Sequence, residues 1–305
     1  MKSDNPPRKH HYIPQFLLEQ WTIGGKLYRY TQPIPGKISR YCKPAKATGF
    51  KEGLYKIPKL PDELAQEVEI KVMKPIDDLA AIAHRKLLTE EGFNKLTSND
   101  RVAWVTFILA LDLRTPDSFS AYKTAVTATY ESDPKCCEVQ AEYEKTKRPK
   151  DPDTYAEYLA INLPVTLEQE PFYALTNVIQ NKELGQYIVN MHWNVLEISN
   201  GSFLLSDEPL LMPKGIKLWN GYIALPISPT KLFLATNNAA TFLQIKGLAG
   251  SLLHKVNMQI VEGAKVFVAA RDTDQEAFIQ THFGKNPRKS VIQHVAEQLS
   301  AKGAS

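Results

Sequence analysis

The chain has 305 residues, of which 43% are hydrophobic and 23% are charged, and its formal net charge is +4. This length suffices to bury a substantial core, and the composition is ordinary for a globular protein. The weak positive charge is spread over scattered lysines and arginines, whereas nucleic-acid binding usually needs a concentrated basic face. Three cysteines, Cys42, Cys136 and Cys137, exclude a disulfide framework and are typical of a reducing compartment.

The N-terminal segment is predicted to be irregular before a short helix begins. Residues 1–9 are polar and contain two prolines, which indicates a disordered tail and not a signal peptide. Pro14 suits the first turn of a helix, where its missing N–H would be unpaired anyway. Gly24 and Gly25 end that helix, and the next six residues alternate as a short strand. Residues 32–60 are expected to be irregular with short strands.

A helical pattern dominates from residue 61 to about residue 190. Pro75 should kink or break the first segment. The next segment opens with a capping box of Thr97 and Asp100 and is apolar on nearly all sides, so it is predicted to be the buried central helix. Its most apolar stretch is too short to span a bilayer. We therefore expect a cytoplasmic protein without a membrane partner.

The pattern changes to alternation at residue 191. Asn200 and Gly201 favour a type I′ turn, which predicts a hairpin between the strands on either side. A helical insertion follows at 239–260. The predicted fold class is α+β, with a helical N-terminal two-thirds packed on a largely antiparallel sheet formed mainly by residues 191–271. We expect one domain over 10–285 and a C-terminal helix or tail over 286–305.

Three groups of polar residues are candidates for a functional site. His10 and His11 precede the first helix, and either could act as a general base or a ligand, although adjacent side chains on an extended chain point to opposite sides. Arg114 ends the central helix, where it could pair with an acidic residue such as Asp112 or Asp207, or bind a phosphate. Asp207 and Glu208 follow a strand, and they could bind a cation or form an ordinary acidic turn.

Other known sites are disfavoured. The pattern His-His-x-x-Pro is superficially similar to an HNH nuclease, but the downstream Asn and His of that fold are missing at the required positions. P-loop, dinucleotide-binding, nucleophile-elbow and zinc-protease motifs are absent as well. Glu69 and Asn257 lie in apolar helical patterns, which is more typical of hydrogen-bonded core or cap residues than of catalytic ones.

Several short motifs occur in an order that resembles the mostly bacterial family catalogued as domain of unknown function 4238. The chain matches it with HHYIPQFLL at 10–18, GLY at 53–55, RTP at 114–116, FLLSDEPLL at 203–211 and PISP at 226–229, together with Trp193 and with Val256–Asn257. Residue 208 is Glu where the family commonly has Asn. The resemblance implies no reaction, but polar motifs in a fixed order favour a shared site.

Two functional hypotheses follow. The first is a hydrolase or nuclease-like enzyme acting on a phosphate-bearing substrate, such as a nucleotide or nucleic acid, with a divalent cation such as Mg²⁺ or Mn²⁺ on Asp207 and Glu208. The second is a binding module without chemistry, in which the same residues form a structural polar network. We expect His10–Gln15, Arg114 and Asp207 to lie around one concave site, with at least one direct contact, either between Arg114 and Asp207 or between a histidine and one of these two. The candidate residues are His10, His11, Tyr12, Gln15, Arg114 and Asp207.

Overall fold

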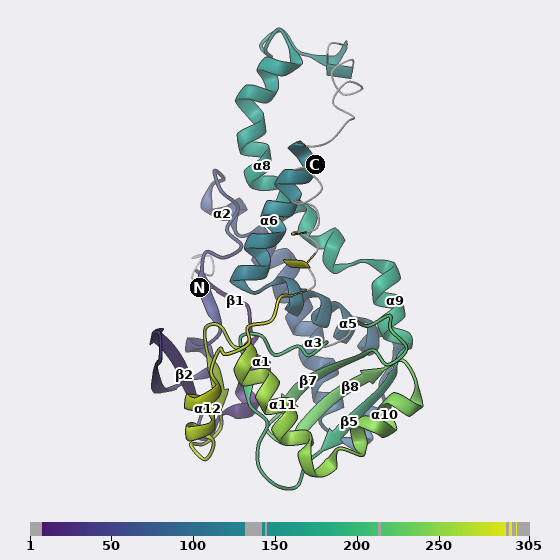
Figure 1. The fold of residues 1–305 in the computed structure, drawn as a ribbon. Coiled ribbons are helices and arrows are strands. Elements are labelled where there is room, and N and C mark those ends of the chain that lie inside the picture. The colour runs from purple at the N-terminus through teal and green to yellow at the C-terminus, as the bar shows by residue number, and fades with distance from the viewer. Residues whose placement is uncertain are drawn as a thin grey trace, which may run out of the picture.

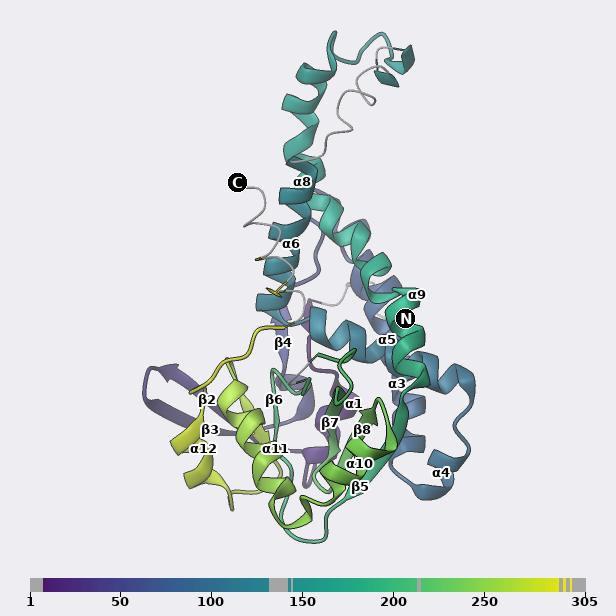
Figure 2. The same ribbon diagram turned by 45° about the vertical axis from the view of Figure 1, so that its right-hand side comes forward.

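The computed structural model describes residues 8–131, 142, 143, 145–212, 215–290, 293, 294 and 297. Helices and strands pack into a body from which α6 (Pro116–Glu131) and α8 (Tyr155–Ile179) extend as an arm (Figures 1 and 2). The α+β class predicted from the sequence is confirmed. The predicted tail falls mainly on residues 1–7, which lie outside the described residues, whereas Lys9 is already in a strand.

In the part of the chain that the structure describes, the strands form three antiparallel sheets. A pair, β1 with β4, joins the N-terminal histidine segment to the chain after Gly49. A second sheet has the order β3-β2-β9-β6, and a third has the order β5-β8-β7. The bounds are β1 Lys9–His11, β2 Leu27–Ile34, β3 Lys37–Lys43, β4 Phe50–Glu52, β5 His192–Glu197, β6 Leu205–Ser206, β7 Tyr222–Ser228, β8 Lys231–Thr236 and β9 Val268–Ala270.

The helices cover these sheets. α10 packs against β5 and β8, while α3 packs on α5 in the body. The remaining bounds are α1 Gln15–Leu18, η1 Glu19–Trp21, η2 Ala45–Ala47, α2 Asp62–Ala65, η3 Val68–Met73, α3 Lys74–Leu87, α4 Glu90–Asn94, α5 Ser98–Leu113, α9 Lys182–Asn190, α10 Ala239–Lys246, α11 Ala249–Gly263 and α12 Glu276–His282.

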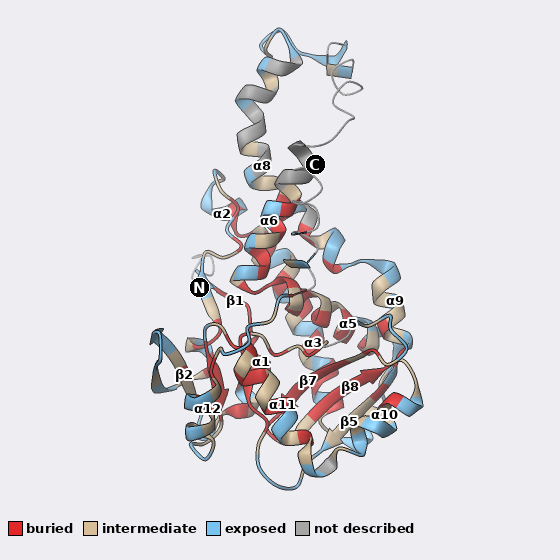
Figure 3. Cartoon of the chain, in the orientation of Figure 1, coloured by how far each residue is buried: buried red, intermediate tan, exposed pale blue. Residues whose placement is uncertain are grey.

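The predicted central helix is α5. Its capping box forms as expected, because the Thr97 hydroxyl accepts the Asp100 N–H and the Asp100 carboxylate accepts the Thr97 N–H. Trp104 and Phe107 on this helix are fully buried. Figure 3 shows that the buried residues concentrate in the body around α5 and the strands. The core thus surrounds the helix whose last residue precedes Arg114.

Pro75 breaks the helical pattern where the sequence predicts it. The six residues of η3 form a π-helix, and the Lys74 N–H donates to the Glu69 carbonyl five residues earlier. Because Pro75 has no N–H, the α-helical bond to the Lys71 carbonyl is missing, and regular α-helix resumes only with α3. Glu69 is therefore on a π-helical turn, a feature that recurs at functional sites.

The hairpin predicted around Asn200 and Gly201 is wrong. Gly201 does adopt a positive φ of 79°, but β5 pairs with β8 and β6 pairs with β9. Between β5 and β6 the chain runs along the turn that joins β7 to β8. Two hydrogen bonds hold it there: the Phe203 N–H donates to the Pro229 carbonyl, and the Ile198 N–H donates to the Thr230 carbonyl. The two strands consequently enter different sheets.

The N-terminal strands contribute more sheet than predicted. β2 and β3 form an eight- and a seven-residue strand, and β2 pairs with β9 near the other end of the chain. The C-terminal helix or tail predicted for 286–305 falls largely outside the described residues. No helix in the described ranges combines the length and the apolar composition needed to cross a membrane.

Candidate functional site

Tyr55 links the histidine segment to Arg114. His10 is fully buried and stacks on the Tyr55 ring, with centroids 5.6 Å apart. Its Nδ1 accepts the Tyr55 N–H at 2.8 Å, so its proton is on Nε2, which donates to Gln66 Oε1 at 2.7 Å. The Tyr55 hydroxyl donates to the Arg114 carbonyl at 2.6 Å. Both nitrogens of His10 are therefore engaged in structural hydrogen bonds.

Arg114 pairs with Asp77 and not with Asp207. Its side chain is completely buried, and Nη1 lies 2.7 Å from Asp77 Oδ1. Nη2 donates to Met73 Sδ at 3.3 Å, while Nε has no hydrogen-bond partner among the described residues. The expected contact with Asp207 is not formed, and the acids whose charge acts on the Arg114 guanidinium are Asp77, near the start of α3, and Glu69. The side-chain hydrogen bonds of Arg114 thus go to Asp77 and Met73, and its charge acts on His11.

Asp207 is a backbone cap. Its carboxylate accepts the N–H groups of Val266 and Phe267 at 3.0 Å and that of Lys265 at 3.2 Å. The side chain is 2% exposed, and burial raises its pKa to about 6 in spite of these bonds. Glu208 lies beside it and pairs with Lys265 Nζ at 3.0 Å. Both acidic residues thus hold the turn that leads into β9.

The expected cation does not fit this donor set. Both oxygens of Asp207 already accept backbone N–H groups, and Glu208 faces an ammonium group. A divalent cation would have to displace these donors and lie beside Lys265. Among the described residues, no group of three or more His, Cys, Asp or Glu side chains could hold a metal ion.

The motifs meet within the core and not, as predicted, around one concave site. Thr115, next to Arg114, has its hydroxyl 3.5 Å from Glu208 Oε1, and the charge of Asp207 contributes to raising the pKa of the buried Tyr12. His10, Tyr55, Arg114, Thr115 and Glu208 therefore form one chain of contacts through the core. These contacts are structural, and the open cleft lies to one side of them.

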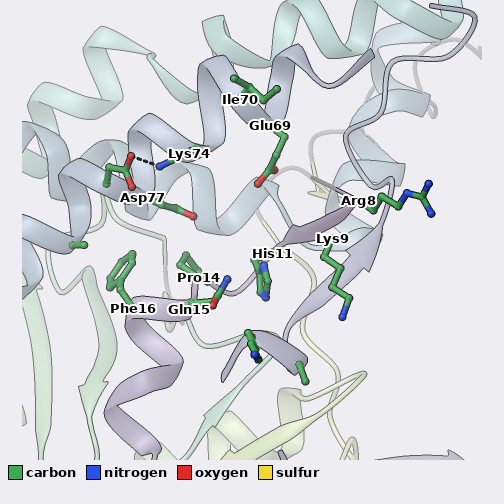
Figure 4. Close-up of a pocket in the computed structure, with 14 residues that line it drawn as sticks. Arg8, Lys9, His11, Pro14, Gln15, Phe16, Glu69, Ile70, Lys74 and Asp77 are labelled. Carbon is green, nitrogen blue, oxygen red and sulfur yellow. Dashed lines mark hydrogen bonds and ion pairs between the residues drawn. The ribbon is translucent and has the colours of Figure 1, made fainter. Parts of the chain in front are cut away.

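A cleft of about 850 Å³ opens between the N-terminal segment and the η3–α3 helix. It is lined by both acidic and basic side chains together with Pro14, Phe16 and Ile70 (Figure 4). Of the candidates predicted from the sequence, His11 and Gln15 line it, whereas His10, Tyr12, Arg114 and Asp207 are buried. The polar lining residues are Arg8, Lys9, His11, Gln15, Lys46, Glu69, Lys74, Asp77 and Asp78.

His11 presents a free nitrogen in this cleft. One ring nitrogen donates to the Lys46 carbonyl, and Nε2 is buried without a hydrogen-bond partner among the described residues. The donor is therefore Nδ1–H, which leaves the Nε2 lone pair available. Burial lowers the pKa of His11 to about 4, and the nearby Arg114 and Lys9 charges act in the same direction. The ring is consequently neutral at pH 7.

The pKa of Glu69 is shifted in the opposite direction to that of His11. Its Oε2 is buried with no hydrogen-bond partner in the described ranges. Burial raises the pKa of Glu69 to about 7, and the Arg114 guanidinium opposes this effect. Figure 4 shows the carboxylate of Glu69 directed from η3 toward the side of the cleft that holds His11. A carboxyl group that exchanges protons near neutrality thus faces the same space as a neutral imidazole.

A known protein family matches most of the chain. The model of a family described as a protein of unknown function, DUF4238, matches residues 9–274. The chain belongs to this family. No curated protein and no solved structure gives a match.

The sequence interpretation of Glu69 missed its place in the site. The family motifs include Arg114 but not the residues that surround its side chain. These residues are Glu69, Met73 and Asp77, which are spaced four apart along η3 and α3. A carboxylate in an apolar helical pattern just before Pro75 is the signal that could have indicated it. Asn257, by contrast, is the hydrogen-bonded core residue that the pattern predicts, because its amide bonds Leu204 and Ser202.

Proposed function

We propose that this protein is a hydrolase that cleaves a phosphate ester in the His11–Glu69 cleft by general acid–base catalysis. The observation that supports it is a pair of titratable side chains, each with an unpartnered buried atom, which line one open cleft. Their pKa values are displaced in opposite directions, to about 4 for His11 and about 7 for Glu69. Pairs of groups with separated pKa values are typical of acid–base sites.

Cations at the cleft favour an anionic substrate. Arg8, Lys9 and Lys46 line it, and none has an ion-pair partner among the described residues. Lys74 is also present but pairs with Asp78. An ammonium or guanidinium group without a carboxylate partner can bind a phosphate oxygen and stabilise the charge that develops during cleavage.

The two side chains suffice for a balanced hydrolysis. Nε2 of His11 takes a proton from water as the water oxygen attacks phosphorus. The bond from phosphorus to the leaving oxygen breaks, and that oxygen takes the proton of Glu69. The imidazolium then returns its proton to the Glu69 carboxylate through water. A bound phosphate raises the pKa of His11, because its negative charge favours the imidazolium, and so makes it a stronger base.

The non-catalytic alternative also has an observation in its favour. His10, Arg114 and Asp207 are buried and form structural hydrogen bonds, as a structural polar network would require. On this hypothesis the cleft binds an anionic ligand and releases it unchanged. Binding without turnover, unaffected by Glu69→Gln, distinguishes it from the hydrolase.

We further propose that the protein acts in the bacterial cytoplasm. A chain with three cysteines, of which Cys42 is free and exposed, suits a reducing compartment.

The test of the hydrolase compares Glu69→Gln with Glu67→Gln on chromogenic phosphomonoesters and phosphodiesters. Glu67 is two residues away and pairs with Lys71, so it is a matched control for loss of one charge. Glu69→Gln and His11→Gln should each lower kcat by about 10²- to 10⁴-fold, as loss of a general acid or base does. Glu67→Gln should retain the wild-type rate. The absence of turnover by wild type on every ester, or an unchanged rate in Glu69→Gln, refutes the proposal.

A further inference from the structure

A basic and aromatic surface continues from the cleft onto the β2–β3 hairpin. From residue 20 to residue 51 the sequence contains no Asp or Glu and seven Lys or Arg, namely Lys26, Arg29, Lys37, Arg40, Lys43, Lys46 and Lys51. A run of this length without an acid gives one part of the surface a strong positive potential, although the whole chain is only weakly basic.

The contacts show that this surface is continuous with the cleft. Lys46 and Ala47 line the cleft, and Arg29 on β2 donates from Nη1 to the Ala47 carbonyl at 3.2 Å. The Arg29 guanidinium lies 5.7 Å from the centroid of the Tyr41 ring, directly across the strand pair. Lys43 Nζ lies 5.8 Å from the same ring. The path therefore runs from the cleft through Arg29 to Tyr41 and Lys43.

A second aromatic ring lies beside His11. Phe50 is directly opposite His11 in the β1–β4 pair, with ring centroids 5.6 Å apart, and Lys9 Nζ lies 4.6 Å from the Phe50 centroid. Each end of the path thus places an aromatic ring beside a cation.

These cations are available to a ligand. Lys9, Arg29, Lys43 and Lys46 have no carboxylate within ion-pair distance among the described residues, whereas Arg40 on the opposite face of β3 pairs with Glu276. Tyr41 is 41% exposed. Cations without a carboxylate partner, next to one exposed and one partly exposed ring, match the repeat of phosphates and bases along a single strand.

We infer that the substrate of the cleft is a single-stranded nucleic acid whose chain continues across the β2–β3 hairpin, with bases stacked on Tyr41 and Phe50. This inference rests on the proposed function for its cleavage step. A single strand fits better than a duplex, because only unpaired bases expose the faces that aromatic rings can stack on.

The test measures binding of fluorescent oligonucleotides to the full chain by anisotropy. Four phosphate contacts predict that the logarithm of the affinity falls with the logarithm of the salt concentration with a slope of about −3. Lys43→Glu/Lys46→Glu should weaken binding and reduce this slope to about half. Tyr41→Ala should weaken binding roughly tenfold through lost stacking. Lys246→Glu/Lys255→Glu changes the net charge equally on exposed positions of α10 and α11 and should bind as wild type does.

Polyglutamate, anionic lipid vesicles and a duplex of equal length are the competing ligands. Each should bind more weakly than single-stranded RNA or DNA. Equal binding of any of them, an unaffected Tyr41→Ala variant, or equal weakening by the α10–α11 control overturns the inference. Cleavage of a small phosphodiester without oligonucleotide binding would refute this inference alone, whereas oligonucleotide binding without any hydrolysis would refute the proposed function alone.

Discussion

Replacement of Arg114 by Met tests how the core beneath the cleft is held together. Arg114 is fully buried, and its Nη1 lies 2.7 Å from the Asp77 carboxylate, whose side chain is 23% exposed. Met fills much of the same space but leaves Asp77 without its cation. Loss of one partner from a buried ion pair typically costs about 3–5 kcal/mol, because the remaining charge is poorly solvated. We expect the free energy of unfolding to fall by this amount.

A double-mutant cycle isolates the pair. Arg114→Met/Asp77→Leu replaces both charges by apolar groups and removes the unpaired carboxylate. The double variant should therefore be more stable than the sum of the two single effects predicts, by at least about 1 kcal/mol. Urea denaturation at pH 7, followed by tryptophan fluorescence, measures all four proteins. A loss below about 1 kcal/mol in Arg114→Met, or strictly additive effects, would show that the pair contributes little.

The pH dependence gives an independent check. Burial raises the pKa of Asp77, and Arg114 opposes this. Without Arg114 the folded-state pKa of Asp77 rises further above its unfolded value, so the folded state retains a proton that the unfolded state has lost. The stability deficit of Arg114→Met should accordingly shrink as the pH falls toward the unfolded pKa near 4. A deficit that grows over this range contradicts the assignment.

Three further outcomes are expected. Turnover requires neutral His11 and protonated Glu69, so kcat/KM should rise through about pH 4 and fall through about pH 7. Glu69→Gln should abolish the fall at alkaline pH. A flat pH profile of the wild type contradicts these roles. Asp207→Ala leaves three backbone N–H groups without an acceptor and should lower the free energy of unfolding by about 3–5 kcal/mol in urea denaturation; a change under 1 kcal/mol would show that Asp207 is not a cap. Gly49 has φ +67°, and a Cβ added there would lie 2.9 Å from Ile13 Cβ, so Gly49→Ala should lower both the melting temperature and turnover. Gly53 is also at positive φ, but its added Cβ would have its nearest neighbour at 3.7 Å, so Gly53→Ala should lower the melting temperature and turnover less. Equal effects of the two variants would refute the crowding argument.

The sequence determined the local elements and the family. Capping at Thr97 and Asp100, the break at Pro75 and the buried character of α5 follow from interactions within a few residues along the chain, so they were predictable. The order of the motifs was sufficient to indicate DUF4238. The acid-free stretch from residue 20 to residue 51 can be read from the sequence, but only the structure shows that the hairpin places its positive charges beside the cleft.

Tertiary structure decided which polar residues are structural and which are open to a ligand. Nothing within a few residues of Arg114 specifies that it pairs with Asp77 and not with Asp207, because that choice depends on how α3 packs on α5. In the same way, His10 is buried and His11 faces the cleft only because β1 pairs with β4 and turns alternate side chains to opposite faces. Hydrogen bonds between distant segments have no signature in the local sequence, so residue type identified the candidates and packing separated a structural His10 from an available His11.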